Sequence, residues 1–328
     1  MKHKVDFLDL VIIRSCQLAC EGCCTFSDHQ KINGLVNPAD AEPAIKFFSQ
    51  YIDPVRVHLF GGEPLMHPKY MDWFRLAFKY WPLATDGKRL PIWLNTNGYY
   101  LDKLFDNIEE LFVENQTFVS VTHHTLEEPY SSLVLNNYKQ LQDLILAEYQ
   151  LRRPNYQWKW VSNTPWDTEH KKFTCLENDL GHRMIMLNMT EQHEDHFVPH
   201  YRGYGPSLKP FHDYNNTTAL NDNHAVCHIK NYVQLYDNRL WKCPPRAVLN
   251  HTLDTYRLTT DSDWGQYYND YKSLALNASE SDVDRWFLQQ KLPENTCNMC
   301  GFMYSNTDLP AQQHLPKKLF KLKNSSDT

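Results

Sequence analysis

Three cysteines stand close together near the start of the chain, where they could bind a metal centre. Cys16, Cys20 and Cys23 are spaced C-x3-C-x2-C in a short loop that directly follows the apolar run at residues 8–13. Thiolates are soft ligands that suit iron–sulfur clusters, and a cubane [4Fe-4S] cluster usually has four of them. Three thiolates would leave one iron open to another ligand. A zinc site or a group of free thiols is the alternative interpretation of these three residues alone.

A second group of residues suited to ligand binding follows the strand-like segment at residues 55–60. Gly61 and Gly62 have no side chain, which lets the backbone approach a ligand closely and adopt unusual dihedral angles. Glu63 then adds a carboxylate that can accept hydrogen bonds, and Pro64 follows it. On its own this stretch also fits a simple turn between a strand and a helix.

The C-terminal part of the chain contains a set of four further cysteines, Cys227, Cys243, Cys297 and Cys300, here called the cysteine quartet. The segment between the first two predicts a β-hairpin with Asp237-Asn238 at its turn, which would bring their thiols to the same end of two paired strands. A predicted helix at residues 281–290 leads to the second pair, spaced C-x2-C. Four thiolates complete one auxiliary [4Fe-4S] cluster, and they equally fit structural zinc.

Composition describes a globular protein and excludes several classes. The 328 residues are 42% hydrophobic and 13% aromatic, and no apolar run approaches the roughly 20 residues that a bilayer span needs. The formal net charge of -6 disfavours a nucleic-acid partner. The N-terminal apolar segment is too short for a secretory signal, so we expect a cytoplasmic protein, in which nine clustered cysteines are better read as metal ligands than as disulfides.

The elements that must position these residues alternate between strand-like and helix-like segments. Strands are expected at residues 6–13, 55–60, 92–96, 117–122, 157–161 and 183–188, and helices near residues 37–52, 68–81, 101–112 and 131–151. Such alternation predicts an α/β fold with parallel strands and crossover helices, whose ligands gather at the carboxyl ends of the strands. The stretch from His193 to Asp222 lacks periodicity and is expected to be an extended connection between two domains.

Together, these motifs resemble the radical S-adenosylmethionine (radical SAM) superfamily. The resemblance implies that Cys16, Cys20 and Cys23 hold a [4Fe-4S] cluster whose open iron binds SAM, and that Gly61, Gly62, Glu63 and Pro64 form the GGEP motif that binds the SAM amino group. Asn97, in Thr96-Asn97-Gly98, and Ser120 are similar to residues that contact SAM in the family. The reduced cluster would cleave SAM to a 5′-deoxyadenosyl radical that abstracts hydrogen from a substrate.

The resemblance also predicts the domain organisation. We expect a partial (β/α)6 TIM-like barrel as the radical SAM core at residues 1–190, a connection at 191–224, a small cluster domain at 225–305 and a tail at 306–328. The cysteine quartet is similar to the twitch or SPASM extension of the family. Its four thiolates fit the shorter twitch version, which implies a second [4Fe-4S] cluster. Substrates in such enzymes are small alcohols or sugars, or peptides and proteins, and an electron donor such as flavodoxin or ferredoxin is implied.

Four positions depart from the family pattern or stand outside it. Gly22 occupies a position that is often aromatic, so Phe26 or another aromatic would have to pack on the adenine, and Thr122 stands where many members have Asp. Cys24 offers an alternative third ligand, although the family spacing favours Cys23. Cys175 is expected to be a bystander thiol. The histidines His123, His124, His193, His196 and His200 are expected to make polar contacts rather than bind a metal.

The alternative function from another class is a non-enzymatic interaction module held together by zinc or a structural cluster.

Overall fold

The computed structural model describes residues 2–18, 20, 23–27, 29, 31–84, 87–124, 128–155, 158–161, 174–178, 183–189, 201–202, 209–227, 229–270 and 273–301. Ten strands in this part of the chain form one sheet in the order β12-β11-β10-β1-β2-β3-β4-β7-β6-β5. They are β1 (His3–Ile13), β2 (Ile52–Gly61), β3 (Ile92–Thr96), β4 (Thr117–His123), β5 (Trp158–Val161), β6 (Thr174–Asn178), β7 (Arg183–Met189), β10 (Tyr232–Tyr236), β11 (Arg239–Trp241) and β12 (Leu274–Ala275).

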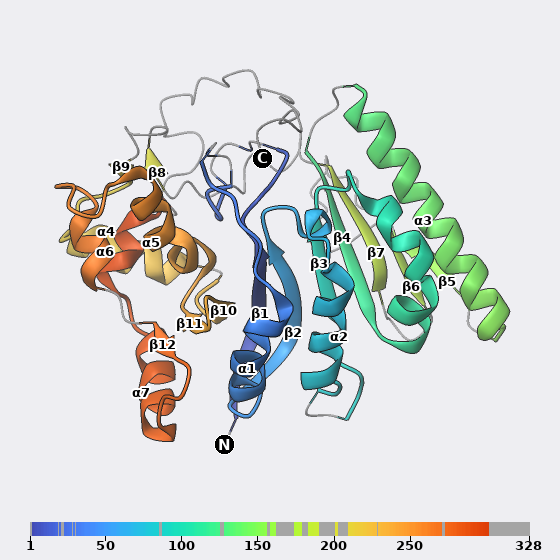
Figure 1. The fold of residues 1–328 in the computed structure, drawn as a ribbon, viewed down its shortest axis with the longest axis horizontal. Coiled ribbons are helices and arrows are strands. Elements are labelled where there is room, and N and C mark those ends of the chain that lie inside the picture. Colours follow the sequence, from blue (N-terminus) through green and yellow to red (C-terminus); the bar gives the residue numbers. More distant parts are fainter. Residues whose placement is uncertain are drawn as a thin grey trace.

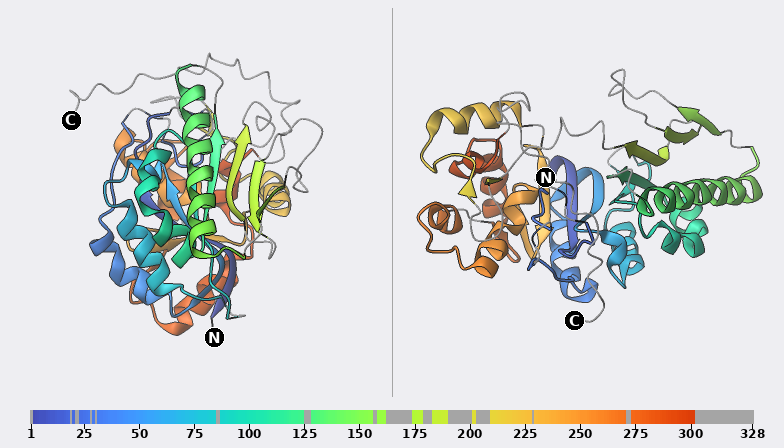
Figure 2. Two further views of the ribbon diagram at one scale, coloured as in Figure 1. Left: turned by 90° about the vertical axis from the view of Figure 1, so that its right-hand side faces the viewer. Right: turned by 90° about the horizontal axis from the view of Figure 1, so that it is seen from above.

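The centre of the sheet is parallel, as the alternation predicts. Neighbouring strands run parallel throughout the series β10-β1-β2-β3-β4-β7. The α1 (Pro38–Phe48), α2 (Tyr70–Tyr80) and α3 (Tyr130–Arg152) helices all lie on one side of it (Figures 1 and 2). The predicted α/β fold, similar to a partial (β/α)6 barrel, is therefore confirmed.

The fifth and sixth predicted strands, at residues 157–161 and 183–188, do not have the neighbours in the sheet that the alternation predicts. The segment predicted at residues 157–161 is the edge strand β5, which pairs antiparallel with β6 rather than continuing the parallel series. β7 pairs with β4 instead, and the parallel strand on the other side of β1 is β10, from the C-terminal part of the chain. Pairing between strands more than 200 residues apart leaves no trace in the local apolar pattern.

Side-chain alternation along the strands divides the sheet into two faces. Leu8, Leu10 and Ile12 of β1, with Val57 and Leu59 of β2, belong to the main hydrophobic core together with buried residues of α1, α2 and α3. The residues between them, among them Asp9 and His58, therefore point to the opposite face, which the three helices do not cover.

A second hydrophobic core forms under the C-terminal helices. Trp241 packs there with buried residues of α5 (Pro244–Tyr256) and with Val11 and Phe26 from the N-terminal part of the chain. The remaining helices are α4 (Thr217–Val226), α6 (Gly265–Asp270) and α7 (Glu280–Gln290). The predicted hairpin turn is present, with Asp237 at φ 53° and Asn238 at φ 55°, the left-handed values that such a turn requires. No helix in the described ranges is long and apolar enough to cross a membrane.

Two predicted elements differ in the structure. Residues 101–112 form no α-helix: they contain a 3-10 helix, η2 (Leu101–Asn107), and the start of a π-helix, η3 (Glu109–Glu114). The predicted extended connection at residues 193–222 includes the short strands β8 (Tyr201–Arg202) and β9 (Lys209–Pro210) and the start of helix α4. Its first part, residues 193–200, and the tail at residues 306–328 lie outside the described residues.

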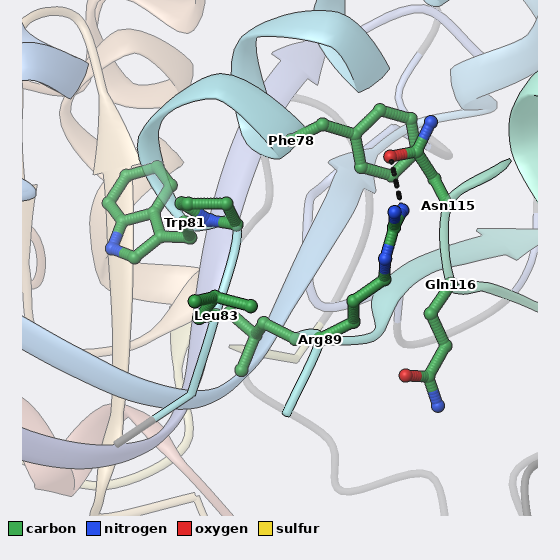
Figure 3. A pocket seen from close by; sticks show the side chains of 8 residues that line it. Phe78, Trp81, Leu83, Arg89, Asn115 and Gln116 are labelled. Atoms are coloured by element: carbon green, nitrogen blue, oxygen red, sulfur yellow. Dashed lines mark hydrogen bonds between the residues drawn. The ribbon is translucent and has the colours of Figure 1, made fainter. Parts of the chain in front are cut away.

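A hollow of about 360 Å³ opens at the amino-terminal end of β3 and β4. It is lined by Trp81 and Leu83 after α2, by Arg89, and by Asn115 and Gln116 before β4; Arg89 Nη1 donates a hydrogen bond to Asn115 Oδ1 over 3.2 Å (Figure 3). The predicted ligand-binding residues follow the opposite, carboxyl ends of the same strands. The hollow is therefore not part of the candidate site.

Candidate active site

The glycine turn after β2 packs directly against the start of the cysteine loop. The backbone N–H of Gly62 donates to Ile13 O over 2.8 Å, and that of Glu63 donates to Ser15 O over 2.9 Å. A Cβ atom on Gly61 would lie 2.0 Å from Ile13 O, and one on Gly62 would lie 2.1 Å from Ser15 O. Neither distance is possible for a real side chain, so both glycines are needed for this close approach.

The carboxylate of Glu63 is fully buried and is held by three donors from the chain itself. Oε1 accepts hydrogen bonds from Leu65 N over 3.0 Å and from Thr96 Oγ1 over 2.7 Å, and Oε2 accepts one from Asn97 N over 2.8 Å. Burial raises the pKa of Glu63 to about 7, although these hydrogen bonds and Lys103 act in the opposite direction. Glu63 thus joins the ends of β2 and β3. Pro64 begins the short 3-10 helix η1 (Pro64–Met66) beside it.

Asn97 connects this carboxylate to the first cysteine. Its side-chain Nδ2 lies 3.8 Å from Cys16 Sγ as a hydrogen-bond donor, and its Oδ1 accepts a hydrogen bond from Gln17 Nε2 over 3.0 Å. The hydroxyl of Tyr130 donates to Asn97 O over 2.5 Å. The predicted residues Cys16, Glu63 and Asn97 are therefore brought together at the carboxyl ends of β1, β2 and β3.

The three cysteines of the N-terminal loop each contact a different part of this site. Cys16 Sγ accepts a hydrogen bond from Leu18 N over 3.4 Å, Cys20 Sγ lies 3.6 Å from His124 Nδ1, and Cys23 Sγ lies 3.2 Å from Thr25 Oγ1. Burial raises the pKa of Cys16, and the neighbouring Glu63 and Cys23 raise it further. Cys16 and Cys23 thus lie close enough to interact electrostatically.

Cys24 faces different neighbours. Burial raises the pKa of its thiol most, followed by Cys23, Asp9 and then Cys243 of the cysteine quartet. The side chain therefore lies toward β1 and the C-terminal part of the chain. This position agrees with a packed thiol beside the metal-binding loop, as predicted.

The cysteine quartet converges in the C-terminal part. Burial raises the pKa of Cys300, and Cys243, Cys297 and Cys227 raise it further. Cys243, whose pKa is raised to about 12 by burial, is also affected by Cys227 and Cys297, and Cys227 is affected by Cys297. Every pair among the four thiols therefore interacts.

Two polar residues hold the segments of the quartet in place. Asn223 on α4 donates from Nδ2 to Cys297 O over 3.1 Å and to Cys300 O over 2.7 Å. The ammonium of Lys242, almost completely buried, donates to Leu292 O over 2.8 Å and lowers the pKa of Cys297 against the effect of burial. A buried cation beside several thiols fits a site that binds an anionic thiolate complex.

A row of polar side chains occupies the sheet face that the helices leave uncovered, and sequence reasoning missed it. Asp9 Oδ1 lies 3.1 Å from His58 Nδ1, and Gln234 Nε2 donates to Asp9 Oδ2 over 2.5 Å. All three side chains are buried, and within the described part of the chain His58 Nε2 and Gln234 Oε1 have no hydrogen-bond partner. Single polar residues within otherwise apolar strands, such as Asp9 between Leu8 and Leu10, are the signal that could have found this row.

Other predicted residues are placed as follows. Ser120 is buried on β4 in register with Asn95 of β3. His123 Nε2 lies 3.1 Å from Ser131 Oγ, which confirms a polar contact. Phe26 is fully buried in the second hydrophobic core, which favours another aromatic residue for packing on the adenine. Cys175 lies in β6, and His193, His196 and His200 lie outside the described residues.

Comparison with known proteins adds to the evidence from the motifs. The model of the radical SAM superfamily matches residues 10–145, the segment that contains the cysteine loop, the GGEP turn and Asn97. This part of the chain is therefore similar to the radical SAM superfamily. A search of curated proteins finds no match.

Two solved proteins resemble the structure. BtrN, in a crystal structure with AdoMet and 2-DOIA, is similar over 92% of this chain and 94% of its own, with 13% identity and a TM-score of 0.47. The anSMEcpe structure with bound AdoMet and the Cp18Cys peptide is similar over 43% of this chain and 41% of its own, with 15% identity and a TM-score of 0.31.

The residues fit the groups that the class requires. Three thiols on one loop supply soft ligands for an iron–sulfur cluster, and the GGEP turn packs directly on the start of that loop. In the described residues, no three His, Cys, Asp or Glu side chains already stand in a metal-holding arrangement.

Proposed function

We propose that the chain is a radical SAM enzyme that abstracts hydrogen from a small polar substrate and carries an auxiliary [4Fe-4S] cluster. The observation that carries the proposal is the contact of Asn97 with both Glu63 and Cys16, at 2.8 Å and 3.8 Å. It joins the GGEP turn, the end of β3 and the first cysteine into one site. Cys16, Cys20 and Cys23 would hold a [4Fe-4S] cluster, which would supply the electron for reductive cleavage of SAM.

The residues around this cluster have binding and positioning roles. The half-buried backbone of Gly61 and Gly62 would receive the methionine part of SAM, because this turn packs on the start of the cysteine loop. Glu63 holds the ends of β2 and β3 together, so its carboxylate acts mainly through the backbone that it orients. Ser120 is proposed to contact the SAM ribose or carboxylate.

The substrate proposed is a small molecule with hydroxyl or amino groups. The buried row of Asp9, His58 and Gln234 supports this choice, since it offers His58 Nε2 and Gln234 Oε1 without partners on the sheet face away from the helices. Buried polar atoms are costly unless they are hydrogen-bonded, so this row favours a polar group over the apolar side chains of a peptide. Oxidation of an alcohol or sugar fits this chemistry.

The cysteine quartet is proposed to hold the auxiliary cluster, with zinc as the rival. The mutual electrostatic effects of its four thiols and the buried Lys242 support a common anionic site, which either metal centre would satisfy. Iron and sulfide analysis decides between them.

Electron paramagnetic resonance (EPR) of the anaerobically reconstituted, dithionite-reduced protein tests the proposed function. Addition of SAM is expected to change the cluster signal, because SAM binds the open iron of the N-terminal cluster. A reduced cluster whose signal is the same with and without SAM would favour the non-enzymatic module instead.

A further inference from the structure

A buried guanidinium lies directly behind the cysteine loop. Arg14 follows β1 and precedes Cys16 by two residues, and its side chain is only 1% exposed. Its Nη2 donates to Thr252 Oγ1 on α5 over 3.0 Å and to Thr25 O over 3.5 Å, and its Cζ lies 5.9 Å from the centre of the Tyr236 ring. Arg14 therefore joins the cysteine loop to the C-terminal helices.

No acidic partner of the Arg14 charge lies among the described residues. None of their ion pairs involves this guanidinium, and its Nε and Nη1 have no hydrogen-bond acceptor there. An uncompensated buried charge is strongly destabilising, so buried arginines are nearly always paired. Burial lowers the pKa of Arg14, and Tyr236 and Cys23 offset part of that effect. An anion close to the Arg14 guanidinium would therefore stabilise its buried charge.

The cysteine loop is a source of negative charge on this side of Arg14. Arg14 contacts the backbone of Thr25, and the Thr25 hydroxyl lies 3.2 Å from Cys23 Sγ. Three thiolates give an iron–sulfur cluster a net negative charge, which increases when the cluster accepts an electron. A fixed cation on this side would favour the reduced state, because net charge and burial set the potentials of such clusters.

We propose that Arg14 is the counter-charge of the cluster on Cys16, Cys20 and Cys23, and that it makes this cluster easier to reduce. The inference rests on the proposed function, since it assumes that the cysteine loop binds the cluster. Arg14 is a positioning residue in this account, because it acts through the cluster and touches neither SAM nor substrate. The electron comes from dithionite or the physiological donor, and the cluster is reduced by one electron.

The test is an EPR-monitored redox titration that follows the SAM-sensitive cluster signal. Arg14→Gln is expected to raise the ratio of oxidised to reduced cluster about tenfold at a fixed potential, which corresponds to about 59 mV for one electron. Arg14→Lys, which keeps the charge, is expected to stay much closer to the unchanged protein. Equal midpoint potentials for Arg14→Gln and the unchanged protein, with equal iron content, would overturn the proposal.

A second pair of variants keeps Arg14 in place in case its replacement prevents folding. Thr252→Asp puts a carboxylate beside Nη2 and neutralises the guanidinium, whereas Thr252→Asn has a similar shape without the charge. The potential is expected to fall in Thr252→Asp relative to Thr252→Asn, and equal potentials in the two variants would contradict the proposal. Absence of any SAM-sensitive signal in the unchanged protein would instead contradict the proposed function.

Discussion

The backbone N–H of Asn97 donates a hydrogen bond of 2.8 Å to the buried carboxylate of Glu63, and this bond fixes the end of β3 against the GGEP turn. The same Asn97 reaches Cys16 Sγ with its side chain. A residue expected from sequence to contact SAM directly therefore also organises the backbone around it.

The ionisation of Glu63 makes the free energy of unfolding depend on pH. Its pKa is raised to about 7 in the folded protein, above the value of about 4.3 for an unperturbed glutamate, so the folded state binds the proton more tightly. The contribution of this group is fully present below about pH 4 and is lost as the pH rises through 7, by up to about 4 kcal/mol. We expect Glu63→Gln to remove this loss.

Urea unfolding between pH 4 and 8 measures the difference. If the unfolding free energies of Glu63→Gln and the unchanged protein vary with pH in the same way, Glu63 does not titrate as described.

Gly61→Ala tests the close approach of the GGEP turn to β1. Gly61 has φ 135°, and a Cβ there would lie 2.0 Å from Ile13 O, so we expect a loss of several kcal/mol in unfolding free energy and loss of SAM binding. Gly34→Ala is the matched control: its φ of 140° imposes similar backbone strain, but no atom lies within 4 Å. The control should cost about 1–3 kcal/mol. Equal losses in both variants would show that the contact with Ile13 is unimportant.

Cys23 and Cys24 are distinguished by substitution. Cys23→Ala should abolish SAM cleavage, since Cys23 interacts with Cys16, whereas Cys24→Ala should largely preserve it because the Cys24 thiol lies toward Asp9 and Cys243. High-performance liquid chromatography of the nucleoside products measures both. The opposite pattern would move the third ligand to Cys24.

Replacement of the quartet is expected to halve the iron content. Cys297→Ala with Cys300→Ala should lower iron from about eight to about four atoms per chain while the SAM-sensitive EPR signal remains. Zinc in the unchanged protein, with about four iron atoms, would assign the quartet to a structural zinc site instead.

Local pattern predicts most of the core and fails where distant contacts decide the structure. The strands at residues 92–96 and 117–122 are predictable because short apolar runs are buried on a sheet. Residues 101–112 have the apolar spacing of an α-helix. However, the Lys103 carbonyl accepts a hydrogen bond from the Tyr70 hydroxyl, and the Lys103 ammonium donates one to Leu65 O. The first part of the segment forms a 3-10 helix in which Leu101 and Leu104 are buried.

Helix α4 is a helix that the apolar pattern does not predict. Its sequence has no apolar face, and only Asn223 is buried in it. Asn216 caps its start by accepting a hydrogen bond from Ala219 N, and Asn223 binds the backbone of Cys297 and Cys300. The helix is thus stabilised by contacts to a segment some 75 residues away, which periodicity cannot reveal.

The most direct test of the central claim is the formation of 5′-deoxyadenosine by the anaerobically reconstituted protein with SAM and dithionite. We predict that the protein produces it, and that Cys16→Ala, which removes a cluster ligand, does not. Intact iron–sulfur clusters, confirmed by iron and sulfide analysis, that yield no 5′-deoxyadenosine above the Cys16→Ala background would contradict the account.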